Sequence, residues 1–236
     1  MVTAINPQHT DPKAIREYAE QFAMHPARMT CIEDFLDRDL AVKLHRFLTE
    51  EAEFYQEFGV YSVDGPVDEA TFLNAEDGDR FFRMSKLAGT KPEHRLSPNA
   101  LAYLSLRSAL NDDAFISFFE QISGMRLRST EDVGVHSMTT GDFLRPHSDA
   151  NKDRRLAFVI YLSLDWSEEF GGVLEVLDRD EKLTRVVPEF NKVIAFDVLA
   201  DSKHLITPIR DPAGTTTRVT IGGWYSGPER AAEQGA

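Results

Sequence analysis

The feature that most constrains the fold is a series of short β-type segments in the second half of the chain. From about residue 125 onward, short apolar or alternating runs follow one another, separated by the turn-forming stretches EEFGG, LDRD, VPEFN and RDPAG. About eight short strands in some 100 residues are typical of a β-sandwich or jelly roll. The predicted strands lie near 132–139, 142–148, 155–164, 172–177, 183–187, 191–198, 203–209 and 217–225.

The first half of the chain has a different pattern and is predicted to be mainly helical. TDPKAIREYAEQFAM begins with the candidate N-cap Asp11 and with Pro12 at the first helical position. Residues 36–58 form a second predicted helix, and residues 96–124 form two more, which end at Gly124. Two short extended segments, RMTCIEDF and FGVYSVDG, flank the second helix, and the polar stretch 65–95 is predicted to be irregular.

These patterns predict a mainly β protein with flanking helices, an α+β fold in which N-terminal helices support a jelly-roll core. A chain of 236 residues is long enough to bury one sizeable core, so we expect a single domain. Within it, residues 1–125 are the mainly helical support, residues 126–226 the jelly-roll core and residues 227–236 a tail.

Bulk composition excludes several classes of function. The net charge of −13 argues against binding to nucleic acid and against docking on anionic lipid. The single cysteine, Cys31, excludes an intramolecular disulfide and a zinc or iron–sulfur site built from cysteines. No signal peptide and no run of 18 apolar residues is found, so the expected location is the cytoplasm.

The pair His147 and Asp149 in GDFLRPHSDA is the first candidate for chemistry. Residues i and i+2 of a strand project to the same face, so both side chains would aim at one point. His204, in the late segment DSKHLITPI, is the candidate third ligand, because a late strand of a jelly roll can lie beside an early one. Two histidines and one carboxylate suit non-haem Fe(II), although catalytic zinc uses the same ligand types. An isolated H-x-D triplet also occurs in ordinary loops, so these residues alone leave the metal and loop interpretations open.

The segment TTTRVTIGGWYSG supplies a second candidate group. Its alternation places Arg218, Thr220, Gly222 and Trp224 on one face. An arginine that faces the inside of a barrel is costly unless it meets an anion, so Arg218 and Thr220 are predicted to clamp a carboxylate. Tyr161, at the end of the apolar run RLAFVIYLSL, is a candidate third donor. The alternatives are an outward arginine in a weak surface ion pair and a plain core tyrosine.

The ordered set of these motifs resembles the Fe(II)- and 2-oxoglutarate-dependent dioxygenases, and most closely their prolyl-4-hydroxylase-like branch. The resemblance covers roughly residues 100–226 and implies a double-stranded β-helix core. It implies that His147, Asp149 and His204 are the iron ligands, and that Arg218 binds the distal carboxylate of 2-oxoglutarate with help from Thr220 and Tyr161. Arg218 follows His204 by fourteen positions, which exceeds the usual spacing, and Arg210 is the rival anchor if the register differs.

The resemblance also implies the reaction. We expect hydroxylation of an unactivated C–H group with Fe(II), 2-oxoglutarate and O₂, with succinate and CO₂ as co-products and ascorbate as a candidate reductant. The expected substrate is a small molecule such as a free or carrier-bound amino acid. The alternative is a prolyl or other hydroxylase that acts on a protein or peptide, and the second alternative is a non-oxidative metal-dependent jelly-roll enzyme or a non-catalytic sensor.

Substrate contacts are predicted on both sides of the ligand pair. Ser137 and Met138 come from the strand before it, and Asn151 and Arg154 come from the segment after it. The segment 60–95 is a candidate lid, or else a loop of no consequence for function. The oligomeric state does not follow from the sequence.

Overall fold

The computed structural model of the chain describes residues 4–130, 132–151, 153–178, 180, 182–198 and 202–228. In this part of the chain the strands join one curled sheet in the order β1-β9-β6-β11-β4-β3-β5-β10-β7-β8, and β2 pairs with β3 beside that order. The strands are β1 (Met29–Ile32), β2 (Ala52–Val60), β3 (Arg80–Thr90), β4 (Asp132–Met138), β5 (Phe143–His147), β6 (Arg154–Tyr161), β7 (Leu174–Leu177), β8 (Leu183–Val186), β9 (Lys192–Asp197), β10 (Lys203–Ile206) and β11 (Arg218–Ser226).

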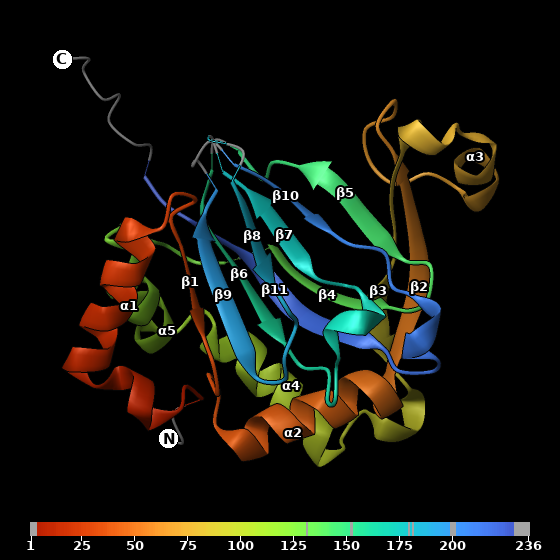
Figure 1. Ribbon diagram of the computed structural model, residues 1–236. Helices are drawn as coiled ribbons and strands as arrows, with labels where there is room; N and C mark the ends of the chain where they lie inside the picture. The colour runs from red at the N-terminus through yellow and green to blue at the C-terminus, as the bar shows by residue number, and fades with distance from the viewer. Residues whose placement is uncertain are drawn as a thin grey trace.

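The curl of this sheet creates an inside and an outside. Figure 1 shows β5, β10, β7 and β8 folded over the part of the sheet formed by β6, β11 and β4. The strand pairs are antiparallel, as the register of β6 and β11 shows, where Tyr161 lies opposite Thr220. The predicted mainly β fold with a jelly-roll core is thereby confirmed, and all eight strands predicted after residue 125 are present.

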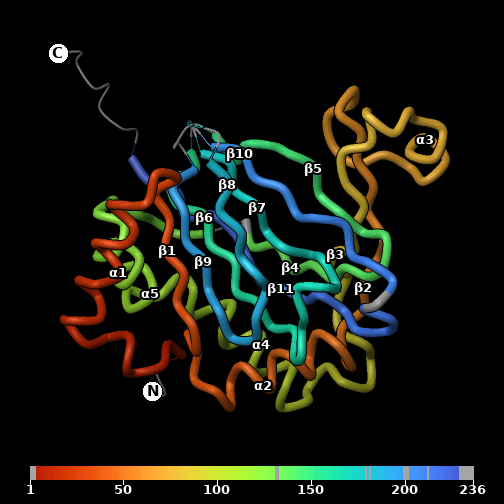
Figure 2. The backbone as a smooth tube through the Cα atoms, in the orientation of Figure 1, coloured from red at the N-terminus to blue at the C-terminus, as the bar shows by residue number. Residues whose placement is uncertain are grey.

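Four helices cover the outside of the larger part of the sheet. These are α1 (Pro12–Met24), α2 (Arg38–Arg46), α4 (Pro98–Ala109) and α5 (Asp113–Ser123). Figure 2 shows α1 and α5 beside β1 and β9, and α2 and α4 at the bottom of the view below the strands, whereas α3 (Glu69–Asn74) projects from the far end of β2 and β3. A single apolar cluster unites the helices with the outer face of the sheet, since Phe22 of α1, Leu44 of α2 and Phe119 of α5 belong to the same core as Phe158 and Val219.

Local sequence signals explain the ends of these helices. The Asp11 carboxylate accepts a hydrogen bond from the Lys13 backbone N–H at 2.8 Å, which caps α1 as predicted. Gly124 ends α5 in the left-handed conformation, with φ of 70°, which costs glycine less than any other residue. The two helices predicted over residues 96–124 are confirmed.

The structure contradicts two predictions for residues 52–95. The second helix ends at Arg46 and is followed by a π-turn over Phe47–Glu51, after which Ala52–Val60 form a strand. The stretch 65–95 is not irregular, because it contains α3 and the eleven-residue strand β3. The lid prediction is therefore wrong for residues 80–90, since β3 is hydrogen-bonded to β2, β4 and β5.

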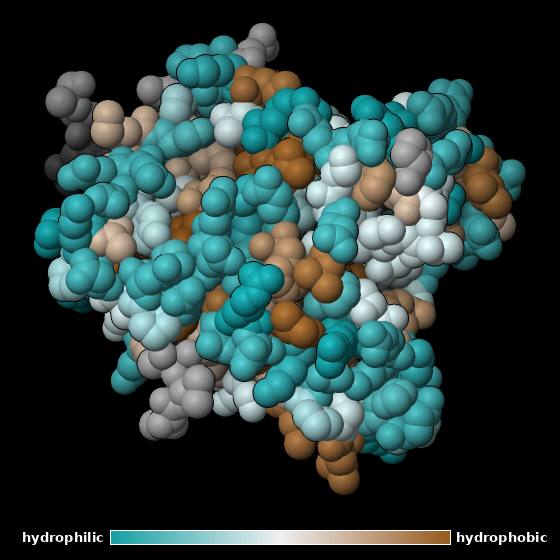
Figure 3. Space-filling view, turned by 60° about the horizontal axis from the view of Figure 1, so that its bottom comes forward, coloured by the Kyte–Doolittle hydropathy of each residue, from teal (hydrophilic) through white to brown (hydrophobic). Residues whose placement is uncertain are grey.

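The described surface is mixed in character. Figure 3 shows hydrophobic side chains in small separate groups among hydrophilic ones on the face that it presents. Single exposed apolar residues of this kind, such as Leu101 and Leu104 of α4, are normal on folded proteins. Within the described residues, no helix has the length and apolar character needed to cross a bilayer. The predicted tail lies largely outside the described residues, which end at residue 228.

Candidate metal centre

Strand pairing brings two histidines together from residues far apart in the chain. β5 and β10 are antiparallel neighbours, and His147 at the end of β5 lies directly opposite His204 of β10. Directly opposed side chains share one face of a sheet and approach closely. The two imidazole rings have their centroids 4.2 Å apart. Phe196 packs against His204 and Phe81 against His147, both edge to face, which fixes the ring planes.

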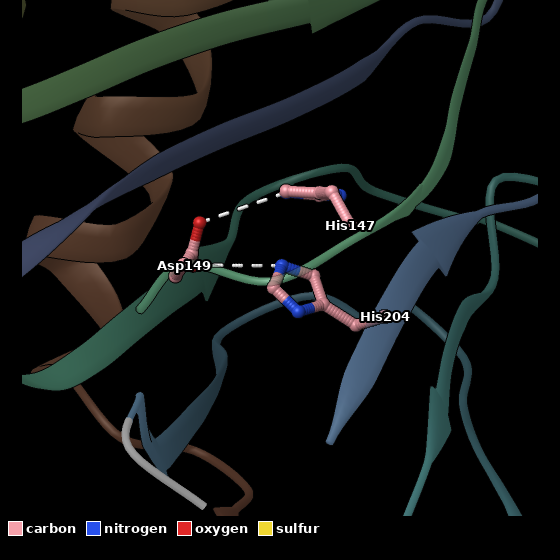
Figure 4. Close-up of side chains that lie close together, drawn as sticks. All are labelled: His147, Asp149 and His204. Carbon is pink, nitrogen blue, oxygen red and sulfur yellow. Dashed lines mark ion pairs between the residues drawn. The ribbon is translucent and has the colours of Figure 1, made fainter. Parts of the chain in front are cut away.

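Asp149 completes the group, as Figure 4 shows, by placing its carboxylate against both imidazoles. It lies two residues beyond His147, just after β5 ends, and so projects to the same side. Its Oδ1 is 3.6 Å from His147 Nε2 and its Oδ2 is 3.5 Å from His204 Nε2. One ligand atom from each of the three residues lies within 4.8 Å of the other two. The structure therefore brings together the three predicted ligands.

The dimensions of this group fit a divalent transition-metal ion. With metal–ligand bonds of about 2.1 Å, adjacent ligand atoms on an octahedral ion are about 3.0 Å apart, so the carboxylate–imidazole distances of 3.5 and 3.6 Å would shorten by about half an ångström when an ion binds. The hydrogen bond between His147 Nδ1 and the backbone carbonyl of Arg145, at 3.1 Å, assigns the proton to Nδ1. His147 Nε2 is then the unprotonated nitrogen that faces Asp149. Two imidazoles and one carboxylate with open positions opposite are the donor set of non-haem Fe(II) sites.

The electrostatics of the group favour the protonation states that bind metal. Burial, together with the neighbouring His147, lowers the pKa of His204 to about 4 despite the opposing effect of Asp149, so its imidazole is neutral at physiological pH. Burial acts to raise the pKa of Asp149. The interaction with His147, the nearby His204 and the hydrogen bond from Trp224 outweigh burial and hold that pKa below its ordinary value. A neutral imidazole and an ionised carboxylate are the forms that coordinate metal.

The second predicted group lies on the inner face of the sheet, beside the ligands. Arg218 and Thr220 of β11 are buried, and Tyr161 of β6 lies opposite Thr220 in the strand register. The Arg218 guanidinium lies 5.2 Å from the centre of the Tyr161 ring and donates from Nε to the carbonyl oxygen of Gly172 at 2.8 Å. The Tyr161 hydroxyl is buried without a hydrogen-bond partner among the described residues. The structure thus brings together a buried cation and an unsatisfied donor that face the same space.

The close approach of Gly172 explains how this arginine is held. Gly172 has φ of +64°, and a Cβ atom there would lie 2.8 Å from Arg218 Cδ and 2.6 Å from Ile209 Cδ1. Only glycine allows its carbonyl and the arginine stem to come so near. The rival anchor Arg210 is exposed on the loop after β10, so Arg218 is the arginine that the register of β11 carries inside.

The four predicted substrate contacts do not share one location. Ser137 faces the helix side of β4, because it follows Val135 by two residues and Val135 belongs to the outer core. Met138 faces inward but is fully buried, and its sulfur lies 3.6 Å from a guanidinium nitrogen of Arg218. Both residues are therefore buried, with Ser137 turned away from the triad and Met138 packed against the anchor. Asn151 and Arg154 do border an open groove of about 470 Å³ that Trp224 also lines.

Two contributors to the site were not predicted from the sequence. Trp224 donates its indole N–H to Asp149 Oδ2 at 2.9 Å. Its place on the Arg218 face of β11 was visible in the alternation and was the signal that could have revealed it. Phe81, the aromatic partner of His147, lies on β3, in a stretch predicted to be irregular, and no signal in the sequence places it here.

Comparison with known proteins assigns this geometry to a family. The model of the 2OG-Fe(II) oxygenase superfamily matches residues 133–226, which include all three candidate ligands and Arg218. Residues 133–226 are thus similar to the 2OG-Fe(II) oxygenase superfamily. The mouse prolyl 3-hydroxylase OGFOD1 is 32% identical over 130 residues, which cover 52% of this chain and 23% of that protein. The chain spans about a quarter of the length of the curated relatives it matches.

Solved structures show the same fold. A prolyl-4-hydroxylase from Pseudomonas putida matches with a TM-score of 0.55 at 19% identity and covers 91% of this chain and 99% of its own. A prolyl hydroxylase from Trichoplax adhaerens, in complex with a hypoxia-inducible factor peptide fragment, matches with a TM-score of 0.60 at 15% identity, and covers 94% and 96%. The double-stranded β-helix core predicted from the resemblance is confirmed by these matches. Similarity to the 2OG-Fe(II) oxygenase superfamily implies Fe(II), 2-oxoglutarate and O₂, and the ligand triad and the buried anchor fit the first two.

Proposed function

We propose that this protein is a 2-oxoglutarate-dependent hydroxylase whose substrate is an amino-acid residue, in the first instance proline, within a peptide or protein. One observation carries the oxygenase part of the proposal. The buried guanidinium of Arg218 lies 5.2 Å from the ring of Tyr161, whose buried hydroxyl has no hydrogen-bond partner among the described residues, and Tyr161 shares an apolar cluster with Phe196, the ring neighbour of His204. A hydrolytic or isomerising metal site has no use for such an anchor, whereas a dicarboxylate cosubstrate requires one.

One group of residues would bind the metal, and a second group would bind 2-oxoglutarate. His147, Asp149 and His204 would hold Fe(II), which supplies, with 2-oxoglutarate and O₂, the oxidation that inserts one oxygen atom into a C–H bond and the other into succinate, with release of CO₂. Arg218 offers two parallel N–H donors to the distal carboxylate of 2-oxoglutarate, and the hydroxyl groups of Thr220 and Tyr161 add further donors.

Apolar side chains surround this anchor. Leu174, Val176 and Ile194 form an apolar cluster with Tyr161 inside the curled sheet. An apolar surrounding strengthens the attraction between a guanidinium and a carboxylate and keeps water away from the reacting groups. We infer that this cluster orients 2-oxoglutarate in a single pose and leaves the opposite side of the triad for substrate.

The choice of a peptidyl substrate departs from the expectation of a free amino acid. The named relatives are prolyl hydroxylases, and one structural neighbour was solved with a peptide bound. The open groove of about 470 Å³ that borders Trp224 would accept residues on either side of a target side chain. A free amino acid fills a closed pocket better than an open groove, so these observations favour the peptide.

The proposal is tested by measuring succinate and substrate mass in one assay. Purified protein with Fe(II), 2-oxoglutarate and O₂ is incubated with a proline-containing peptide library and, separately, with free amino acids. We expect succinate formation coupled to a mass gain of one oxygen atom in peptides. The variants His147→Ala and Asp149→Ala should lose both products while they retain the folded circular dichroism spectrum. Succinate from either variant, or oxygen incorporation into free amino acids alone, would contradict the proposal.

A further inference from the structure

The carboxylate of Asp149 has a hydrogen bond that the proposed reaction does not explain. Trp224 Nε1 donates to Oδ2 at 2.9 Å, in addition to the approach of His204 Nε2 to that oxygen. Oδ1 faces His147 Nε2 instead, at 3.6 Å. The indole N–H is a donor that cannot accept, so it takes up one of the two lone pairs of Oδ2 and makes that oxygen a poorer metal ligand than Oδ1.

The indole is itself held in place from its other side. Arg154 lies with its guanidinium carbon 3.6 Å from the centre of the Trp224 ring, a close cation–π contact. Arg154 begins β6 opposite Ser226, and Trp224 lies opposite Ala157, so the two side chains meet diagonally across neighbouring strands. Arg154 was predicted as a substrate contact, but its side chain is stacked on the residue that bonds the metal ligand.

We infer that Trp224 is a positioning residue that keeps Asp149 a one-oxygen ligand, and that Arg154 fixes the indole for this purpose. The inference rests on the metal site of the proposed function. A carboxylate can bind a metal through one oxygen or through both. With Oδ2 engaged by Trp224, Asp149 contributes Oδ1 alone, and the triad occupies three positions of an octahedral ion.

The number of oxygens that Asp149 contributes decides how many coordination positions of the metal stay open. A chelating cosubstrate needs two positions and O₂ needs one, so the reaction requires all three that a one-oxygen Asp149 leaves free. If Oδ2 also bound, only two would remain. Outer hydrogen bonds to ligands commonly change metal affinity 10- to 100-fold, and here the hydrogen bond also sets the number of open positions.

The test counts water on the metal and needs no turnover. Mn(II) is loaded without 2-oxoglutarate, and the proton relaxation of bulk water reports the number of exchangeable waters on the ion. Trp224→Phe keeps the aromatic ring and removes the donor. We expect three waters in the wild type and two in W224F, a fall of about one third in relaxivity per bound ion.

The matched control is the other tryptophan of the chain. Trp166→Phe removes an indole hydrogen bond of similar length, from Nε1 to the carbonyl oxygen of Gly171 at 3.0 Å, which does not involve Asp149. We expect its relaxivity to equal that of the wild type. If W166F fell as far as W224F, or if W224F kept the wild-type value, the role assigned to Trp224 would be refuted.

A second variant addresses Arg154. Arg154→Met removes the stacked cation and should lower the relaxivity by part of the W224F change. In the W224F background the same substitution should have no further effect, because the donor that Arg154 positions is gone. Additive losses would overturn the role of Arg154. A wild-type protein that bound no Mn(II) would overturn the proposed function together with this inference, whereas equal relaxivity in wild type and W224F would overturn the inference alone.

Discussion

Replacing Arg218 by methionine is expected to make the protein more stable and at the same time unable to hold 2-oxoglutarate. Arg218 is 2% exposed; its guanidinium contacts the Gly172 carbonyl, the Met138 sulfur and the Tyr161 ring, and no ion pair with a carboxylate is found among the described residues. A buried cation without a counter-ion is costly, and burial lowers the pKa of Arg218, which reports the same cost. Methionine fills a similar volume without charge.

The two effects can be estimated separately. Replacing buried charges by apolar groups of similar volume commonly stabilises proteins by about 1–4 kcal/mol, and the lost hydrogen bond to Gly172 offsets about 1 kcal/mol of that gain. Loss of a buried, doubly hydrogen-bonded partner costs a charged ligand about 2–5 kcal/mol, which is roughly 30-fold to several-thousand-fold in Kd. A ligand at 1,000 times its Kd stabilises a protein by about 4.1 kcal/mol, which exceeds the net gain of R218M, so 2-oxoglutarate at that concentration should reverse the order of stability.

The assay is urea unfolding of the Mn(II)-loaded protein with and without 2-oxoglutarate. Without 2-oxoglutarate, R218M should unfold at a higher urea concentration than the wild type. With 2-oxoglutarate, the wild type should unfold at the higher urea concentration. Arg210→Met is the matched control, because Arg210 is exposed and should leave both curves unchanged. An R218M protein that is less stable than wild type without ligand, or that 2-oxoglutarate still stabilises, would refute the reasoning, and loss of the ligand effect in R210M would identify Arg210 as the anchor.

Three further outcomes follow from buried polar groups. Tyr161→Phe removes a buried hydroxyl without a partner, so the ligand-free protein should be as stable as the wild type or up to about 2 kcal/mol more stable, while calorimetry should show several-fold weaker 2-oxoglutarate binding. The pKa of His204 falls from 6.5 in the unfolded chain to about 4 in the folded protein. The unfolded chain therefore binds the proton first, and the free energy of unfolding of the metal-free protein should fall by about 3 kcal/mol between pH 6.5 and pH 4. Urea unfolding at these two pH values should show a smaller fall for His204→Asn. Asp142→Ala should lower the free energy of unfolding by about 3–5 kcal/mol in the same assay, because the buried Asp142 pairs with Arg83 at 2.8 Å. The control is Asp77→Ala, which removes the exposed ion pair with Arg145 and should change the free energy of unfolding little.

The strands after residue 125 and the ligand pair were predictable because their signals are local. Alternation and turn residues act within ten residues, and the i, i+2 relation of His147 and Asp149 needs only an extended backbone. His204 is different. Its place opposite His147 depends on the register of β5 and β10, which are not adjacent in the sequence, and only the order of motifs suggested it.

The failures have physical causes of two kinds. Residues 52–58 continue the helical pattern with good helix formers such as Ala52, Glu53 and Glu57, but pairing with β3 along their whole length overrides that propensity. Ser137 was placed in the site by position in the chain, yet a strand reverses its faces at every residue, so the neighbour of an inward Met138 points to the helices. Alternation alone does not say which of the two faces of β4 points to the helices. That assignment needs one residue whose face is known, and Val135 provides it only because it belongs to the outer core.

The distribution of unsatisfied polar groups locates the function independently of any motif. Among the described residues the buried side-chain atoms without a hydrogen bond are Arg83 Nε, Thr130 Oγ1 and the Tyr161 hydroxyl. Arg83 is nevertheless ion-paired to Asp142, and Thr130 carries no charge. Tyr161 alone of the three lies against a buried cation, Arg218, and near the metal ligands. Folding tolerates such a combination only where a ligand compensates for it, and the ligand must then be an anion small enough to lie between that cation and a bound metal, which is the description of a short dicarboxylate.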